Sequence, residues 1–222
     1  MTALFVVGGV IVVGTLFGQW YFSRRRRLIR ELDSTEAVAI EKFPEGVRAK
    51  IVGTLEFDGK PLVSPLTGRE CAYYHITVEE KIKSGNNSRW YEIIREEKRL
   101  HFRLADASGI AIVDTGAAEV VADVCVELKS GTFDDPSPQE EEYLATHGKR
   151  GKDWFFNKAL RYREGILEAG EMVSVYGRGV REPDPEGVDE AEGYRGLPPM
   201  RLRMSGSFDE PLLISDNEAT ID

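Results

Sequence analysis

Cysteine and histidine are scarce in this 222-residue chain, which holds two cysteines and three histidines. The two cysteines, Cys71 and Cys125, could form at most one disulfide and cannot build a disulfide framework. A cross-brace zinc domain holds two zinc ions with four ligands each, more ligands than these five residues supply. No P-loop, GxSxG, HExxH or CxxC motif is present either. The sequence therefore predicts no metal site, no cofactor and no catalytic residue.

Basic residues are also in the minority, except at the N-terminus. The formal charge of the chain is −9, yet residues 1–30 carry five arginines and no acidic residue. The remaining part holds 24 Lys and Arg against 38 Asp and Glu, a formal charge of −14. Such an acidic part is repelled by phosphate backbones, so we expect no nucleic-acid partner. Acidity of this kind also keeps a protein soluble.

A long uncharged stretch, residues 3–22, reads ALFVVGGVIVVGTLFGQWYF. About 20 helical residues span the ~30 Å hydrocarbon core of a bilayer. A cleaved signal peptide is the alternative, but nothing basic precedes this stretch. Trp20 and Tyr21 suit the membrane interface, and the arginines that follow should remain cytoplasmic: Arg24, Arg25, Arg26 and Arg27. We expect a single-pass anchor at 1–23, an external N-terminus and a cytoplasmic domain, in the cell membrane if the source is prokaryotic.

Two further interactions of this anchor follow from its sequence. Gly14 and Gly18 form a GxxxG pair, which lets two membrane helices approach closely and self-associate. A single GxxxG also arises by chance, because glycine is common in membrane helices. The arginine block could contact anionic headgroups of the bilayer, as a by-product of the topology. Residues 24–44 then read as a basic juxtamembrane helix and a short linker.

The rest of the chain is predicted to be mainly β, a small barrel or sandwich with one or two short helices. We expect this domain at 45–215 and a frayed tail at 216–222. The pattern indicates a long hairpin over 70–104, one strand over 119–128 and a short helix over 139–146. Residues 155–167 have helical spacing but many β-compatible residues, and we favour a strand there. Strands are also expected at 171–180, near Leu202 and over 212–214. Gly53 inside the first strand indicates a bulge or a close backbone approach.

The segment SPLTGRECAYYHI, residues 64–76, places a serine, a cysteine and a histidine close together in sequence. On one strand, Cys71 and His75 would lie about 13 Å apart, too far for a nucleophile and its base. Cys71 alternates in phase with Tyr73, which indicates a core position. Pro65 and Gly68 suit a tight turn before the strand.

The acidic and basic side chains of the domain offer few other candidates. Asp106, followed by Ser108 and Gly109, could form a metal or phosphate loop, but an Asx turn at a hairpin tip is the favoured interpretation. Glu164 and Glu168 would share a face of a strand, and nothing else marks a carboxylate pair. The basic stretch HGKRGKDW, residues 147–154, is expected to be a solvated loop.

Several blocks together resemble the GIDE domain, also called the beside-a-membrane or BAM domain. They are GxLxF at 53–57, SPLTGRECAYYHITVEE at 64–80, W…E at 90–92, FRLADASGIAIVDTGAA at 102–118, YREGILEAGEMVSVYGRGV at 162–180 and DEPLLIS at 209–215. The resemblance covers roughly 45–215. The motif positions to which we give a structural role are Gly53, Ser64, Pro65, Gly68, Cys71, Tyr74, Asp106, Gly109, Tyr162, Glu164, Gly170 and Gly177.

The resemblance implies a membrane-proximal module that binds a protein partner of unknown identity. This domain occurs in membrane-anchored RING ubiquitin ligases of mitochondria and plastids, and in prokaryotic membrane proteins without a RING. The RING cysteines have no counterpart here. We therefore expect a binding or scaffold module without a catalytic centre; the alternative is a ligase-like subunit of a protein-modification system.

Overall fold

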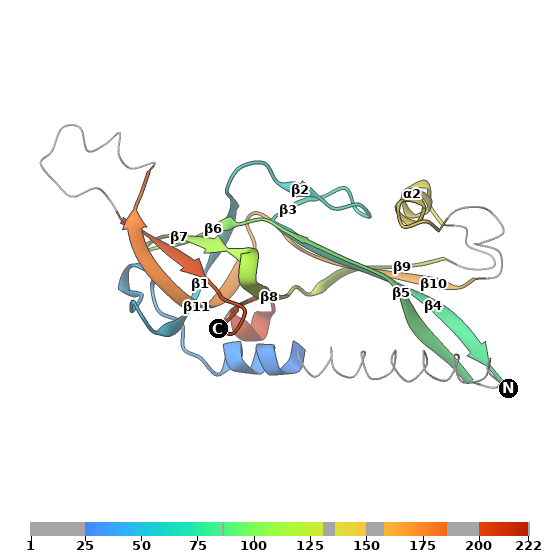
Figure 1. Ribbon diagram of the computed structural model, residues 1–222, viewed down its shortest axis with the longest axis horizontal. Helices are drawn as coiled ribbons and strands as arrows, with labels where there is room; N and C mark the ends of the chain where they lie inside the picture. The colour runs from blue at the N-terminus through green and yellow to red at the C-terminus, as the bar shows by residue number, and fades with distance from the viewer. Residues whose placement is uncertain (1–24, 86, 131–135, 150–157, 186–199, 222) are drawn as a thin grey trace, which may run out of the picture.

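The computed structural model describes residues 25–85, 87–130, 136–149, 158–185 and 200–221 (Figure 1). These residues are mainly β-strand, as predicted, and form two sheets and a small hairpin. The larger sheet, here the barrel sheet, has seven strands, whose order in space is β1 (Arg48–Phe57), β6 (Phe102–Asp106), β7 (Gly109–Asp114), β12 (Met200–Ser205), β11 (Met172–Pro183), β13 (Leu212–Ser215) and β8 (Ala118–Val121). Because β1 also pairs with β11, five of these strands close into a ring.

The second sheet has four antiparallel strands, in the order β5 (Asn87–Arg99), β4 (Tyr73–Ser84), β10 (Leu160–Leu167) and β9 (Val124–Ser130). The hairpin joins β2 (Leu62–Val63) to β3 (Glu70–Cys71). Helix α2 (Pro138–Thr146) and this hairpin lie over the same side of the second sheet (Figure 1). Three short 3₁₀ helices complete the fold: η1 (Ile40–Lys42), η2 (Thr115–Ala117) and η4 (Glu218–Thr220).

Each sheet encloses its own hydrophobic core. The ring of the barrel sheet is filled by aliphatic and aromatic side chains such as Ile51, Phe102 and Val175. A second cluster lies between the second sheet and α2, where Tyr74 and Tyr162 meet Leu144. The chain alternates between the two sheets several times, so both cores form from residues far apart in sequence.

Residues 25–33 form a helix that packs against the barrel sheet instead of projecting from it (Figure 1). Leu28 and Leu32 are buried against Val121 and Leu213. Lys50, fully buried on β1, donates from Nζ to the carbonyl oxygens of Leu32 at 3.1 Å and of Thr220 at 3.2 Å. The helix next to the predicted anchor is therefore a part of the folded domain.

The anchor itself lies outside the described residues, as do its features Gly14, Gly18, Trp20, Tyr21 and Arg24. Within the part of the chain that the structure describes, no helix is both long and apolar enough to cross a bilayer.

Two segments that we predicted to be continuous, a hairpin and a strand, are each divided between the two sheets. The hairpin expected over 70–104 ends at Arg99, because the chain leaves the second sheet there and β6 enters the barrel sheet. The strand expected over 119–128 is likewise two strands, since β8 pairs with β13 and β9 pairs with β10. Local alternation predicts an extended chain and does not reveal where that chain changes sheets.

The predicted alternation after Cys71 is also wrong by one residue. The chain bends at Ala72, between β3 and β4, so Cys71 belongs to the core cluster of Tyr74, and Ala72 joins Tyr73 in the barrel core.

The structure also corrects the expectation that residues 216–222 form a frayed tail. Thr220 is fully buried, and its hydroxyl accepts a hydrogen bond from Ser174 at 2.8 Å.

Candidate functional site

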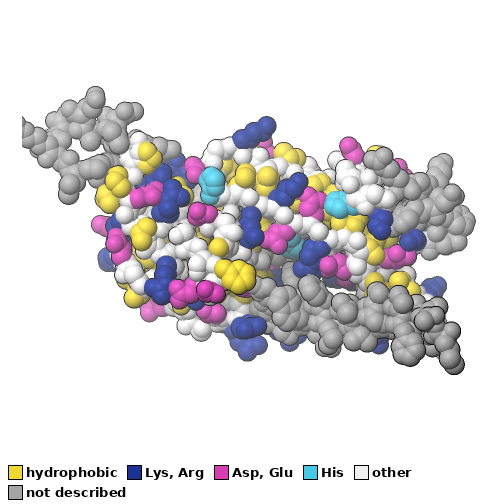
Figure 2. Space-filling view, in the orientation of Figure 1, with side chains coloured by type: hydrophobic (Ala, Val, Ile, Leu, Met, Phe, Trp, Pro, Cys, Tyr) yellow, Lys and Arg dark blue, Asp and Glu magenta, His cyan; other side chains and the backbone are white. Residues whose placement is uncertain are grey.

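A cleft of about 650 Å³ lies between the turn after β2, strand β5 and helix α2. We call it the α2 cleft. Its lining combines apolar, hydroxyl and charged side chains: Val63, Ser64, Pro65, Gly68, Glu96, Lys98, Gln139, Glu142, Tyr143, Thr146 and His147. Elsewhere on the face drawn in Figure 2, basic and acidic side chains interleave. The α2 cleft contains three positions that the sequence singled out, namely Ser64, Pro65 and Gly68.

One wall of the cleft is the predicted Pro–Gly turn. The amide of Gly68 donates to the carbonyl of Ser64 at 2.9 Å, and the amide of Ser64 donates to the carbonyl of Arg69 at 2.9 Å. Gly68 has φ of 70°, a left-handed conformation that favours glycine. Pro65 supplies the φ that such a turn needs at its second position. The turn therefore forms from local sequence alone, and it holds Ser64 at the edge of the cleft.

The opposite wall is α2, whose start is also encoded locally. Ser137 and Glu140 form a capping box, in which the serine hydroxyl accepts from the Glu140 amide and the Glu140 carboxylate accepts from the Ser137 amide. Pro138 occupies the first helical turn, where its missing N–H costs nothing. Tyr143 and Leu144 then face the second sheet, which leaves Gln139, Glu142 and their neighbours to line the cleft.

Glu96 on β5 is the centre of a polar network in the cleft. It accepts from the Tyr74 hydroxyl at 2.7 Å, forms an ion pair with Lys98 at 3.1 Å, and lies 3.3 Å from the Nε2 of His147. Burial alone would raise the pKa of Glu96, but hydrogen bonds from Tyr74 and Lys98, with the nearby positive charge, hold it below its usual value. Burial, together with the Glu96 carboxylate, raises the pKa of Tyr74 to about 12. Glu96 is thus a permanent acceptor near neutral pH.

His147 links this network to α2. Its Nδ1 lies 3.0 Å from the carbonyl oxygen of Tyr143, and its Nε2 faces Glu96. Each ring nitrogen therefore lies within hydrogen-bond distance of an oxygen, and Nδ1 also lies 3.1 Å from the Thr146 hydroxyl. The rings of His147 and Tyr143 lie 4.7 Å apart, so the histidine also packs against the helix.

The Tyr143 hydroxyl is the unusual group in the cleft. The side chain is 3% exposed, and the hydroxyl forms no hydrogen bond of normal geometry within the described residues, although it lies close to the Glu96 carboxylate. Burial, with the negative charge of Glu96, raises its pKa above the usual value, so the group remains protonated. A buried hydroxyl without a partner costs about 1–3 kcal/mol.

Beneath the turn, Ser64 donates to Glu164 of β10, and both side chains are buried. Sequence reasoning placed these two residues in separate motifs, because their 100-residue separation hides the contact. Glu164 is fully buried, and its second carboxylate oxygen has no hydrogen-bond partner in the described part of the chain. The pair therefore forms a polar floor below the α2 cleft.

Neither thiol near this floor has the character of a nucleophile. Burial and the neighbouring Glu164 raise the pKa of Cys71 to about 12, and the same two causes raise that of Cys125. The Sγ of Cys125 is partly buried, although the residue as a whole lies at the surface, and it donates weakly to the Glu164 carbonyl at 3.4 Å. His75 packs beside Tyr73, away from the cluster of Cys71, with its pKa lowered to about 4 by burial and by the charges of two arginines.

Asp106 forms the Asx turn that we favoured over a metal or phosphate loop. Its Oδ1 accepts from the Ser108 amide at 2.7 Å and from the Gly109 amide at 2.9 Å. Its Oδ2 accepts from the amide of Ile40 at 2.9 Å, which fixes η1 against the turn between β6 and β7. Although burial would raise the pKa of Asp106, these hydrogen bonds hold it below its usual value. Its role is to attach the linker to the barrel sheet.

The remaining motif positions are structural and lie away from the cleft. Gly53 on β1 lies against β6, where an added Cβ would come within 2.6 Å of the Ala105 carbonyl oxygen. Gly170 has φ of 91° in the turn between β10 and β11, and Gly177 faces the Leu212 side chain. Tyr162 is fully buried in the core below α2.

Among the described residues, no three His, Cys, Asp or Glu side chains lie together in a way that could hold a metal ion. In comparisons with protein-family models, curated proteins and solved structures, no match to this chain was found.

Proposed function

We propose that the protein is a membrane-proximal binding module, and that the α2 cleft takes up a segment of a partner protein. The observation that carries this proposal is the cleft itself, about 650 Å³ between α2, β5 and the turn after β2, where the buried Tyr143 hydroxyl lies beside the Glu96 network. A site of this size with a few convergent polar groups is typical of ligand binding. The resemblance to the GIDE/BAM domain is part of the same proposal.

The composition of the cleft favours a polypeptide with basic side chains. Val63 is 57% exposed and, with Pro65, offers an apolar surface for an extended chain. Glu142 adds a carboxylate on the α2 wall, whereas Glu96 is already engaged by Tyr74, Lys98 and His147. The chain beyond residue 30 carries a formal charge of −14, which attracts basic segments over longer distances.

The membrane part of the proposal rests on residues 1–23 and on the helix that follows. Because Leu28 and Leu32 are buried in the domain, only a few residues separate the predicted span from a folded surface. A domain attached in this way has little freedom to move away from the bilayer. Its partner would therefore be bound close to the membrane surface.

The test is site-specific photo-crosslinking of the full chain in its own membranes. A photoreactive residue replaces Val63 in the cleft or, as a matched control, the 99% exposed Phe208 on the loop before β13. We expect a defined crosslinked product from position 63 only. Tyr143→Phe should reduce its yield about fivefold, since one hydrogen bond contributes about 1 kcal/mol. Glu142→Lys should reduce the yield further if the partner segment is basic.

Equal products from positions 63 and 208, or no product from position 63, would refute the cleft as the binding site. A product that Glu142→Lys strengthens would instead show that the bound segment is acidic.

A further inference from the structure

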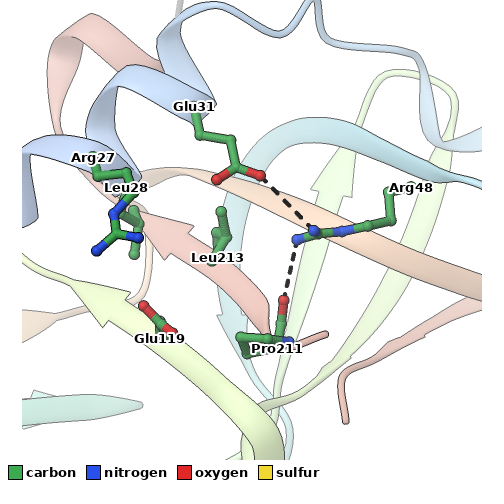
Figure 3. Close-up of a pocket in the computed structure, with 7 residues that line it drawn as sticks. All are labelled: Arg27, Leu28, Glu31, Arg48, Glu119, Pro211 and Leu213. Carbon is green, nitrogen blue, oxygen red and sulfur yellow. Dashed lines mark hydrogen bonds and ion pairs between the residues drawn. The ribbon is translucent and has the colours of Figure 1, made fainter. Parts of the chain in front are cut away.

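A smaller pocket, between the helix of residues 25–33 and the barrel sheet, is occupied by contacts of the chain itself. Figure 3 shows Arg48 between Glu31, which lies 3.8 Å away, and the Pro211 carbonyl oxygen, to which it donates at 3.3 Å. The guanidinium and the carboxylate are thus engaged with each other. A larger set of unpaired polar groups, those of the backbone, lies along one edge of the second sheet.

Strand β9 forms this edge. It pairs with β10 on one side, and no strand of the described ranges pairs with its other side. Its exposed side chains include two apolar ones, Val124 at 42% and Leu128 at 36%. An edge of this kind presents a row of amides and carbonyls to which a further strand can be added.

The ladder of the sheet shows which backbone groups of β9 point outward. The Lys81 amide on β4 donates to the Ala159 carbonyl just before β10. Because successive residues of a strand point to opposite sides, the backbone groups of Tyr162 are directed toward β9, where Tyr162 pairs with Leu128. Leu128 therefore uses its amide and carbonyl on β10, and the residues on either side of Leu128 direct theirs away from the sheet.

The side chains of β9 protect this edge less than those of β5 protect the opposite edge. Strand β5 carries charged side chains at seven of its 13 positions, and charge is a common protection of an exposed edge. Strand β9 carries two, Glu127 and Lys129. A bulge opposite Glu164 and Gly165 interrupts only the start of β9, so residues 126–130 continue as a regular strand. This part of the edge is open to pairing.

The order of residues in the regular part is self-complementary. If a second copy pairs antiparallel about a two-fold axis through Leu128, Glu127 of each copy lies opposite Lys129 of the other. Within one strand these two residues already form an ion pair at 2.9 Å, so the four charges alternate in sign and no existing pair breaks. Glu127 also keeps its hydrogen bond from Arg163 on β10.

The same axis suits the backbone and the apolar side chain. Glu127 and Lys129, whose backbone groups point outward, would form the hydrogen-bonded pairs. The two Leu128 side chains would meet in a non-hydrogen-bonded pair, where opposite side chains lie closest. Moving the axis by one residue would place two Glu127 or two Lys129 side chains opposite each other, and such like-charge pairs are destabilising. The charges therefore select one register.

We propose that β9 pairs with β9 of a second copy of this chain, which joins the two four-stranded sheets into one continuous sheet. The α2 cleft borders β5, at the opposite edge, so the dimer would carry two separate clefts. This inference does not depend on what the α2 cleft binds.

The experiment is disulfide crosslinking of the full chain in its own membranes, with Cys125→Ser as the background. Leu128→Cys should give a disulfide-linked dimer under mild oxidation, because the two thiols would lie opposite each other within disulfide reach. Val124→Cys is the matched control, since Val124 is similarly exposed on the same strand. Its two copies would lie eight residues apart, about 26 Å, and should give at least tenfold less dimer.

A charge exchange tests the register. Lys129→Glu, combined with Leu128→Cys, places like charges opposite each other twice and should reduce the yield of dimer about tenfold. Adding Glu127→Lys restores opposite charges across the axis and should recover most of the yield. Gly14→Ile should leave the yield unchanged, because the GxxxG pair of the predicted anchor has no part in this contact.

Equal yields from positions 128 and 124, or no dimer from position 128, would overturn the proposal. Failure of Glu127→Lys to restore the yield would overturn the register, and with it the argument from charge. Loss of the dimer with Gly14→Ile would show that the anchor and not β9 brings the copies together. A crosslink from position 128 to a different protein would show that another strand covers this edge.

Discussion

The attachment of residues 25–33 to the domain leads to a prediction for Leu32→Ala. Leu32 is fully buried, and its side chain, with that of Leu28, holds the helix against Val121 and Leu213. Truncating a buried leucine to alanine costs about 2–5 kcal/mol. The Leu32 carbonyl that accepts from Lys50 is unchanged, so we take a cost of about 3 kcal/mol. We expect the substitution to weaken the docking of the helix on the barrel sheet more than it weakens the sheets themselves.

Hydrogen exchange of the full chain in nanodiscs measures this docking directly. A loss of about 3 kcal/mol should accelerate exchange of the helix amides about 150-fold, while the strands of the barrel sheet change much less. Asp33→Ala is the control, because Asp33 is the exposed neighbour of Leu32 on the same helix. An acceleration of less than about fivefold with Leu32→Ala, or the same acceleration with Asp33→Ala, would refute the idea that the helix belongs to the folded domain.

Three more predictions concern stability. Gly53→Ala places a Cβ within 2.6 Å of a backbone oxygen, which should cost about 3 kcal/mol and lower Tm by about 6–12 °C. Gly109→Ala is the control, because its Cβ would meet the nearest atom at 3.5 Å and the Tm should not change. Equal Tm values for the two variants would refute this prediction. Ser64→Ala removes the hydrogen bond to buried Glu164 and should lower Tm by about 4–8 °C, measured by the same scan. Burial raises the pKa of Asp216 to about 6, so its charged form destabilises the fold above pH 6, and this penalty disappears as the pH falls toward 4. Asp216→Asn should therefore stabilise at pH 7.5 but not at pH 4, as urea unfolding at both pH values can check.

The turns and the strands could be predicted from sequence because their causes are local. Pro65 and Gly68 determine a turn, and Asp106 determines another, whatever the rest of the chain does. The short helix after Pro138 follows in the same way from its capping box. Each of these elements depends on residues within a few positions of one another.

The candidate sites could not be predicted, because they depend on contacts over long separations. Glu96 and His147 meet only when α2 lies over the second sheet, and Leu28 meets Leu213 only when the helix docks on the barrel sheet. Fully buried Lys50 gave no signal at all, since a lysine in an imperfectly alternating strand is ordinarily assigned to the surface. Its partners are backbone carbonyls, which no sequence motif marks.

Lys50 also has a mechanical consequence. Its ammonium joins the carbonyl of Leu32, near the end of the helix, to the carbonyl of Thr220, in the last turn that the structure describes. A force or a rearrangement at residues 216–221 would thus reach the helix of residues 25–33 through one side chain. A partner or fusion that pulls on this end could loosen the helix while the sheets stay folded. The helix of residues 25–33 and the turn at Thr220 would then move together.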